Sequence, residues 1–231
     1  MNKVVRYFVT GAMLTLAIAL GTGVANAATW SSTDAFGSWT YNGYYFNNDV
    51  WGSGAGAQTI WANTQANWGV WSDQPNTGGV KSYPHVGRDV GKSLSALSSV
   101  TSSYAVTNPG SGAFETAYDI WANGSSYEIM LWVNKTGAVG PIGSQVATAT
   151  VGGSSWNVYS GSNGSNPVYS FLRTSNSSSG SVDILAILKW IEAKGWYGNV
   201  TLSTVQFGWE ITSTNGTGEN FATTNFSVSS S

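Results

Sequence analysis

Apolar and polar residues alternate along the segment 127–133, which is the pattern of a β-strand that buries one face. The odd-numbered residues of this segment are all apolar and are expected to face a core. Glu128, Met130 and Trp132 share the opposite face. A carboxyl group is thereby predicted beside aromatic and apolar side chains on the polar face of a strand.

A second segment near the carboxyl terminus, residues 205–212, repeats this arrangement. Its odd-numbered residues are again apolar, and Gln206, Gly208, Glu210 and Thr212 lie on the other face. The chain therefore carries two strands, far apart in sequence, that each present a glutamate. Two carboxyl groups in tryptophan-rich surroundings are the equipment for breaking a glycosidic bond.

Further short runs of β-forming residues recur at close spacing, with turn signals such as Asn42-Gly43 between them. This density predicts an all-β jelly roll of two curved antiparallel sheets, one lying over the other and leaving a concave outer face. The Ser, Gly and Asn-rich segments 160–166 and 175–181 are interpreted as loops. The expected strands cover residues 37–41, 44–46, 59–61, 68–71, 100–106, 114–121, 127–134, 145–151, 154–159, 168–173, 200–209 and 221–229.

Residues 181–194 break the strand pattern. Ile184, Leu188 and Ile191 recur at helical spacing, Ser181 is a candidate cap, and Gly195 follows the last turn. The segment predicts one amphipathic α-helix packed on the convex side of a sheet.

The first 27 residues are interpreted as a signal peptide. Lys3 and Arg6 precede an apolar run, and residues 25–27 form a small-x-small cleavage site. The alternative is an uncleaved membrane anchor, which the short, glycine-interrupted apolar run disfavours. Cleavage after Ala27 leaves residues 28–231 as a single secreted domain, without a membrane segment and expected to be a monomer.

Charge and composition narrow the class of ligand. Removing Lys3 and Arg6 leaves seven basic against eleven acidic residues, a net charge of −4, which excludes a typical nucleic-acid-binding protein. Charged residues make up 9% of the chain, against about 25% in ordinary soluble proteins. Twelve tryptophans and eleven tyrosines suit stacking on sugar rings, although more than half of them are expected in the core.

The chain lacks the residues that thiol catalysis and the common metal sites require. The chain has no cysteine, which excludes thiol catalysis and cysteine-built metal sites, and a domain of this size does not need disulfides for export. The single histidine, His85, cannot form the usual histidine cluster of a zinc site and is expected in a loop beside Pro84. Neither a metal nor a cofactor is expected.

Several segments together are similar to glycoside hydrolase family 12. They include Tyr-Asp-Ile-Trp at 118–121, Tyr-Glu-Ile-Met-Leu-Trp at 127–132 and Gln-Phe-Gly-Trp-Glu at 206–210. Asn-Asn-Asp-Val-Trp-Gly at 47–52, Lys-Ser-Tyr-Pro at 81–84, Gly-Pro-Ile-Gly-Ser at 140–144 and Val-Gly-Gly-Ser-Ser-Trp at 151–156 extend the resemblance over essentially the whole mature chain. The resemblance implies a jelly-roll endo-β-1,4-glucanase that retains anomeric configuration.

The resemblance also assigns roles to three carboxyl groups. Glu128 resembles the family's nucleophile, Glu210 its general acid/base, and Asp119 the carboxylate that hydrogen-bonds the nucleophile. A retaining mechanism agrees with this assignment, because it needs two carboxyl groups about 5–5.5 Å apart across the scissile bond. A close pair does not easily ionise twice, so one proton should remain on the acid.

Six further residues are candidates for substrate binding. Trp51 resembles a sugar-stacking platform at a distal glycone subsite, and Pro141 belongs to a loop that resembles the one crossing the cleft in this family. Met130 and Trp132 are candidates for the cleft floor. Gln206 is expected near the acid/base. Asn48 lies beside the platform in the Asn-Asn pair.

The interpretation leaves alternatives open. Cellulose-type β-glucan is the favoured substrate, and a xyloglucan-specific endo-β-1,4-glucanase of the same family is the first alternative. A jelly-roll xylanase of family 11 has the same architecture and two glutamates, but the Glu-Ile-Met-Leu-Trp context disfavours it. A carbohydrate-binding module, lectin or adhesive protein would not need paired glutamates.

Overall fold

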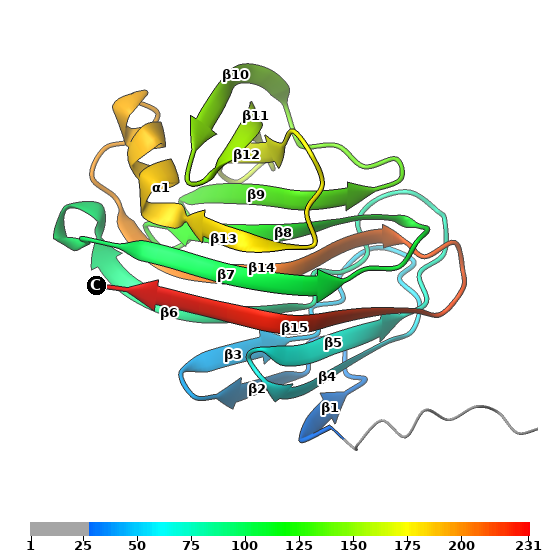
Figure 1. Ribbon diagram of the computed structural model, residues 1–231. Coiled ribbons are helices and arrows are strands. Elements are labelled where there is room, and N and C mark those ends of the chain that lie inside the picture. Colours follow the sequence, from blue (N-terminus) through cyan, green and yellow to red (C-terminus); the bar gives the residue numbers. More distant parts are fainter. Residues whose placement is uncertain (1–27) are drawn as a thin grey trace, which may run out of the picture.

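The protein is described by a computed structural model covering residues 28–231, in which two sheets are layered face to face (Figure 1). The smaller sheet has the strand order β1 (Trp30–Ser32), β4 (Gln58–Thr64), β5 (Asn67–Ser72), β15 (Glu219–Ser230), β7 (Val100–Thr107), β13 (Ser179–Asp183). The larger sheet has the order β10 (Ser144–Val151), β11 (Ser154–Ser162), β12 (Pro167–Arg173), β9 (Tyr127–Thr136), β8 (Ala113–Ala122), β14 (Thr201–Ser213), β6 (His85–Ser93), β3 (Tyr44–Asn47), β2 (Ser38–Tyr41). A short 3-10 turn, Leu94–Ala96, follows β6. The predicted all-β jelly roll is confirmed.

Alternation along the strands places the core as predicted. On β9 the side chains of Ile129, Leu131 and Val133 are fully buried between the sheets, and on β14 those of Phe207 and Trp209 are as well. The opposite, concave face of the larger sheet carries the polar series of both strands. Burial of each large apolar side chain contributes roughly 1.5–3 kcal/mol, so a one-residue register shift in either strand is strongly disfavoured.

One strand pair departs from the expected antiparallel sheets. Strand β12 runs parallel to β9, with Val168 opposite Glu128 and Ser170 opposite Met130. The strands β10, β11 and β12 form an antiparallel meander, and its third strand returns beside β9 in the same direction. The concave face of the larger sheet is thereby extended by three strands beyond β9.

The helix α1 (Ile184–Ala193) is shorter than predicted. Residues 181–183 belong to β13, where Ser181 pairs with Ser103 of β7, and the segment 175–181 is therefore not wholly a loop. Asp183 is the N-cap, because its carboxylate accepts a hydrogen bond from the backbone N–H of Ala186 at 3.0 Å. The helix propensity of residues 181–183 did not reveal that they pair with β7, which extends strand β13 up to the N-cap.

The helix covers the convex face of the larger sheet beyond the edge of the smaller one, as predicted (Figure 1). Trp190 meets Phe171 of β12 edge to face, with ring centroids 5.6 Å apart. The buried face of the helix joins the common core.

The prediction that His85 lies in a loop is wrong. It is the first residue of β6, buried between β14 and β3, and this strand was missed. The sequence of this strand, His-Val-Gly-Arg-Asp-Val-Gly-Lys-Ser, does not show a clear alternation of apolar and polar residues, because glycines and charged residues interrupt it. A Cβ at Gly87 would lie 2.2 Å from the Tyr45 ring, so glycine lets this ring pack directly on the backbone of β6.

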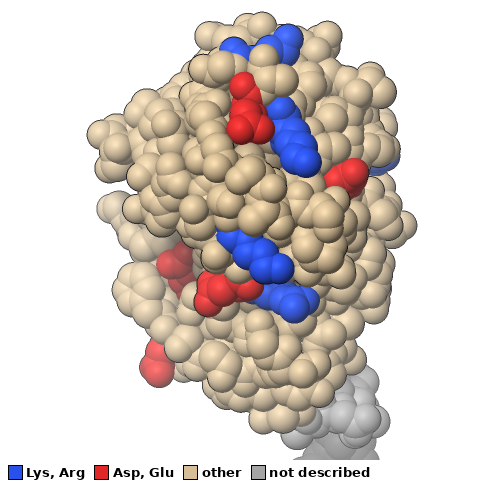
Figure 2. Space-filling model, turned by 90° about the vertical axis from the view of Figure 1, so that its left-hand side faces the viewer, with Lys and Arg blue, Asp and Glu red and all other residues tan. Residues whose placement is uncertain are grey.

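Within residues 28–231, no helix is both long and apolar enough to span a membrane. The predicted signal peptide lies outside the described residues. Figure 2 shows a face on which the few charged side chains gather in small groups of both signs, with wide uncharged areas between the groups, in keeping with the low charge of the chain.

Candidate active site

Two adjoining cavities form a cleft on the concave face of the larger sheet, and Glu128, Met130, Ile142 and Glu210 line both of them. Each has a volume of about 300 Å³, at the lower end of the range of ligand pockets. Other residues that line the first cavity are Gly79, Val80, Glu115, Trp132, Ala138, Val139, Gly140 and Thr212. Those of the second are Asp49, Trp51, Tyr83, Asp119, Trp121 and Asn163. The cleft therefore continues to both sides of the two glutamates.

Strand β8 lies between the strands that carry these glutamates. Glu128 of β9 is opposite Trp121, and Glu210 of β14 is opposite Glu115, six residues away along β8, and both side chains line the same two cavities. Burial raises the pKa of Glu128, and the charge of Glu210 raises it further. The charge of Glu210 thus makes the ionised form of Glu128 less favourable.

Asp119 lies on β8 between the two glutamates. Its Oδ2 accepts a hydrogen bond from the indole Nε1 of Trp121 at 3.0 Å. Among the described residues, Oδ1 is buried without a hydrogen-bond partner. Burial raises the pKa of Asp119 well above its ordinary value, and the charges of Glu128 and Glu210 raise it further. Burial and the two glutamates thus favour the protonated form of Asp119, whose hydrogen bond is with Trp121 and not with Glu128.

An asparagine that the sequence interpretation missed binds Glu128 directly. The Asn163 side-chain amide donates a hydrogen bond to Glu128 Oε2 at 2.8 Å. Its own Oδ1 accepts from the backbone N–H groups of Ser165 and Asn166, at 2.9 and 3.0 Å, which fixes its orientation. Hydrogen bonds from Asn163 and Asn166 lower the pKa of Glu128, against the effect of burial. Nothing distinguishes this residue from its neighbours in a loop rich in Ser, Gly and Asn.

Replacing Asn163 with alanine should move the acidic limb of the pH–activity profile to higher pH. The variant loses a donor that favours the ionised form of Glu128, so the pKa of this carboxyl rises. We expect kcat/KM at the wild-type optimum to fall by about tenfold, since hydrogen bonds to charged groups contribute about 1.5–3 kcal/mol. Ser165→Ala, in the same loop, is the matched control. An acidic limb that stays in place would contradict this role.

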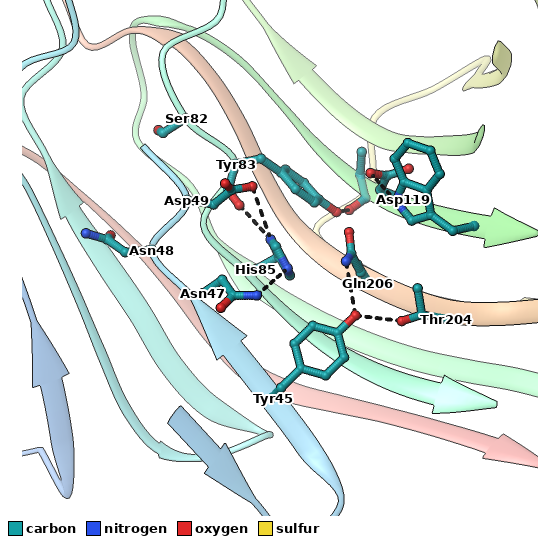
Figure 3. Close-up of polar contacts among 12 residues, drawn as sticks. Tyr45, Asn47, Asn48, Asp49, Ser82, Tyr83, His85, Asp119, Thr204 and Gln206 are labelled. Atoms are coloured by element: carbon teal, nitrogen blue, oxygen red, sulfur yellow. Dashed lines mark hydrogen bonds and ion pairs between the residues drawn. The ribbon is translucent and has the colours of Figure 1, made fainter. Parts of the chain in front are cut away.

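A polar cluster borders the second cavity (Figure 3). The ring of His85 lies 2.7 Å (Nδ1) from the carbonyl of Tyr83 and 3.3 Å (Nε2) from the amide nitrogen of Asn47. These partners fit a neutral imidazole with Nδ1–H, and burial lowers its pKa to about 4. Its 3.9 Å approach to Asp49 is thus not an ion pair at neutral pH.

Asp49 itself has a left-handed backbone, with φ of 44°. Its carboxyl lines the cavity, and burial raises its pKa to about 6. Non-glycine residues in this conformation cost about 1–3 kcal/mol and cluster at functional sites. Asp49 was not among the predicted site residues.

Three of the predicted substrate-binding residues lie in the cleft. Trp51 lines the second cavity with 54% of its surface exposed, as a stacking platform requires. Met130 lines both cavities and Trp132 the first, so they form part of the floor. Whether they contact a sugar stays a prediction.

The other three lie elsewhere. Asn48 is fully buried, donates to the carbonyl of Asp34 and accepts from Gln58, and so supports the loop that carries Asp49. Gln206 donates to the hydroxyl of Tyr45 at 3.0 Å and lines neither cavity (Figure 3).

Pro141 also lines neither cavity, and its neighbour Ile142 lines both. Gly143, with φ of 84°, packs against the backbone of Ser160 and brings Ile142 against Gly161.

A buried carboxyl group that the sequence interpretation missed completes the site. Glu115 lies on the concave face of β8 with 2% of its surface exposed. The alternation of Glu115, Ala117 and Asp119 along β8 was the available signal. Within residues 28–231, no group of three or more His, Cys, Asp or Glu is arranged to hold a metal ion.

The chain matches a known enzyme family over most of its length. Residues 42–230 match the model of glycosyl hydrolase family 12. A xyloglucan-specific endo-β-1,4-glucanase A of Emericella nidulans is 33% identical over 223 residues, covering 86% of this chain and 92% of that protein.

Solved structures give the same result. The xyloglucanase domain of NopAA from Sinorhizobium fredii, in complex with cellobiose, superimposes with a TM-score of 0.86 and 44% identity over 88% of this chain and 100% of that one. An endoglucanase from Rhodothermus marinus superimposes with a TM-score of 0.80 and 26% identity over 88% of this chain and 99% of that one.

Proposed function

Since this chain belongs to glycosyl hydrolase family 12 and is a glycoside hydrolase of the endo-β-1,4-glucanase type, we propose that it is a secreted, monomeric, retaining enzyme that cleaves xyloglucan. The observation that carries the proposal is the position of Glu128 and Glu210, which line both halves of one cleft. Because the cleft continues to both sides of them, a glucan chain can be bound around an internal bond.

Glu128 is proposed as the nucleophile. It is held by Asn163, and it lies opposite Trp121, two residues along β8 from Asp119. Its carboxylate attacks the anomeric carbon and forms a covalent glycosyl-enzyme. Asp119, which keeps its own proton, adds no second negative charge beside it. A hydrogen bond from its O–H to Glu128 would weaken as Glu128 loses its charge in the glycosyl-enzyme and would strengthen again as Glu128 is released as a carboxylate.

Glu210 is proposed as the general acid/base. In the first step its proton passes to the glycosidic oxygen as the bond to the anomeric carbon breaks, and the leaving chain departs as an alcohol. In the second step the resulting Glu210 carboxylate takes a proton from water, whose oxygen attacks the anomeric carbon and releases Glu128. The two displacements together retain the β configuration.

Xyloglucan is favoured over the initially expected cellulose-type substrate. Both the fungal relative and the bacterial structure with 44% identity are xyloglucan-cleaving enzymes by name. The endoglucanase from Rhodothermus marinus is less similar. The exposed Trp51 would stack on a backbone glucose, since an aromatic face suits the apolar side of a sugar ring.

The test is a comparison of initial rates on xyloglucan, mixed-linkage β-glucan, carboxymethylcellulose and xylan at equal mass concentration. We expect kcat/KM to be at least about tenfold higher on xyloglucan than on carboxymethylcellulose, equivalent to about 1.4 kcal/mol in transition-state binding. Equal or faster cleavage of carboxymethylcellulose would contradict the preference for xyloglucan and would indicate a general cellulase. Preferred cleavage of xylan would contradict the substrate class.

Secretion and oligomeric state require separate measurements. Mass spectrometry of the protein recovered from the culture medium should give an amino terminus at Ala28. A cell-bound protein that still carries residues 1–27 would instead favour an uncleaved membrane anchor. Light scattering should give the mass of one chain.

A further inference from the structure

Four carboxyl groups follow one another along the groove above β8, and the reaction described above uses three of them. Glu128 lies opposite Trp121, Asp119 lies on β8 itself, and Glu210 lies opposite Glu115. Glu115 is therefore level with Glu210 at the end of the series, on the strand that lies between Glu210 and the strand of Glu128. It lines the first cavity but is almost completely shielded from solvent.

Direct neighbours across two antiparallel strands have Cβ atoms about 4.5–5.5 Å apart. Glu115 and Glu210 are such neighbours and share the concave face of the sheet. Two ionised carboxylates at this separation, with one of them buried, would repel each other strongly. One of the two must retain a proton.

The other charged group opposite Glu115 is Lys135 of β9. Its ammonium group donates to the carbonyl oxygen of Val139 at 3.0 Å. Among residues 28–231, no salt bridge joins Lys135 to Glu115. A buried carboxylate without an ion-pair partner is costly, so the proton resides on Glu115.

The balance of effects on Glu115 supports this placement. Burial raises its pKa well above the ordinary value, and the charge and hydrogen bond of Glu210 raise it further. A backbone hydrogen bond and the charge of Lys135 act in the opposite direction, and both effects are smaller. Glu128 lines the same cavity, and its negative charge would also favour the protonated form.

We propose that Glu115 is a positioning residue, a neutral carboxylic acid that donates a hydrogen bond to Glu210 and holds it toward the cleft. The inference rests on the proposed role of Glu210. A donor on Glu210 favours its ionised form. It therefore aids the second step, in which Glu210 must accept a proton from water, and limits the pH range in which Glu210 is the acid.

Two substitutions separate this role from simple packing. Glu115→Met removes the donor while keeping an unbranched side chain of similar length. We expect kcat on xyloglucan to fall by about tenfold with KM unchanged, because Glu210 loses its orientation, and the alkaline limb of the pH profile to move to higher pH. Glu115→Gln keeps a donor and adds no charge. Its loss of kcat should be smaller, and its alkaline limb should stay in place.

A downward shift of the alkaline limb in Glu115→Gln would show that Glu115 is ionised in the wild type and would overturn the proposal. A wild-type pH profile in Glu115→Met would overturn it as well. Glutamine is nearly isosteric with glutamate. If Glu115→Met does not fold, the alkaline limb of Glu115→Gln alone therefore tests whether Glu115 is neutral. Glu192→Gln, which removes a carboxylate from α1, is the control for an unspecific effect of charge.

A separate variant distinguishes a failure of the proposed function from a failure of the inference about Glu115. If Glu210→Ala keeps wild-type activity, Glu210 is not the acid/base, whatever the Glu115 variants do. If Glu210→Ala is inactive and the alkaline limb of Glu115→Met does not move, the inference about Glu115 alone is wrong.

Discussion

Replacement of Glu128 by alanine should reduce kcat on xyloglucan by more than about 10⁴-fold, the order of loss seen when a covalent nucleophile is removed. The variant retains the cleft, Glu210 and Trp51, so binding of the polysaccharide should persist. Glu192→Ala, which removes a carboxylate from the helix on the opposite side of the larger sheet, is the control for expression and folding.

Added azide should restore part of the activity of Glu128→Ala on an activated aryl cello-oligoside. The small anion occupies the space of the missing carboxylate and attacks the anomeric carbon from the same side. The product is then an α-glycosyl azide, with inverted configuration, which can be identified by proton NMR. An inactive variant that azide does not rescue, or one that forms a β-azide, would contradict the nucleophile assignment.

Replacement of Glu210 by alanine should have a large effect that depends on the leaving group. General acid catalysis contributes about 10²–10⁴-fold, so hydrolysis of xyloglucan should fall by that amount. An aryl glycoside with a good leaving group does not need protonation, and its first step should be nearly as fast as in the wild type. A burst of released phenol followed by slow turnover would then report an accumulating glycosyl-enzyme.

The same variant should lose the alkaline limb of its pH profile, because the group that must be protonated is absent. Azide should here give a β-glycosyl azide, through attack on the glycosyl-enzyme. An equal loss of rate on polysaccharide and aryl glycoside would indicate a structural effect of the substitution and would count against Glu210 as the acid.

Strand alternation predicted the parts of the site that lie on regular, half-buried strands. Glu128 and Glu210 could be placed on one concave face because their neighbours at odd positions are uniformly apolar and fill the core. The hairpin from β8 to β9 was also predictable, since Asn123 and Gly124 adopt the left-handed conformation that a tight turn requires. These features are local, and the residues around each of them favour the same strand or turn.

Features that depend on long-range contacts were not predictable from the same patterns. Strand β6 is defined by pairing with β14 and β3, and its own sequence reads as polar. Asn163 bonds Glu128 across 35 residues of sequence from an ordinary loop. Asn48 and Asp49 are adjacent, but a single positive φ turns one into the interior and the other into the cleft.

The stereochemical course of the reaction shows whether Glu128 and Glu210 cooperate in a double displacement. Proton NMR of the wild-type protein with a xyloglucan oligosaccharide follows the anomeric signals of the first products before mutarotation. The account predicts that the β-anomer appears first and the α-anomer only later, at the rate of spontaneous equilibration. Initial formation of the α-anomer would mean a single displacement by water and would contradict it.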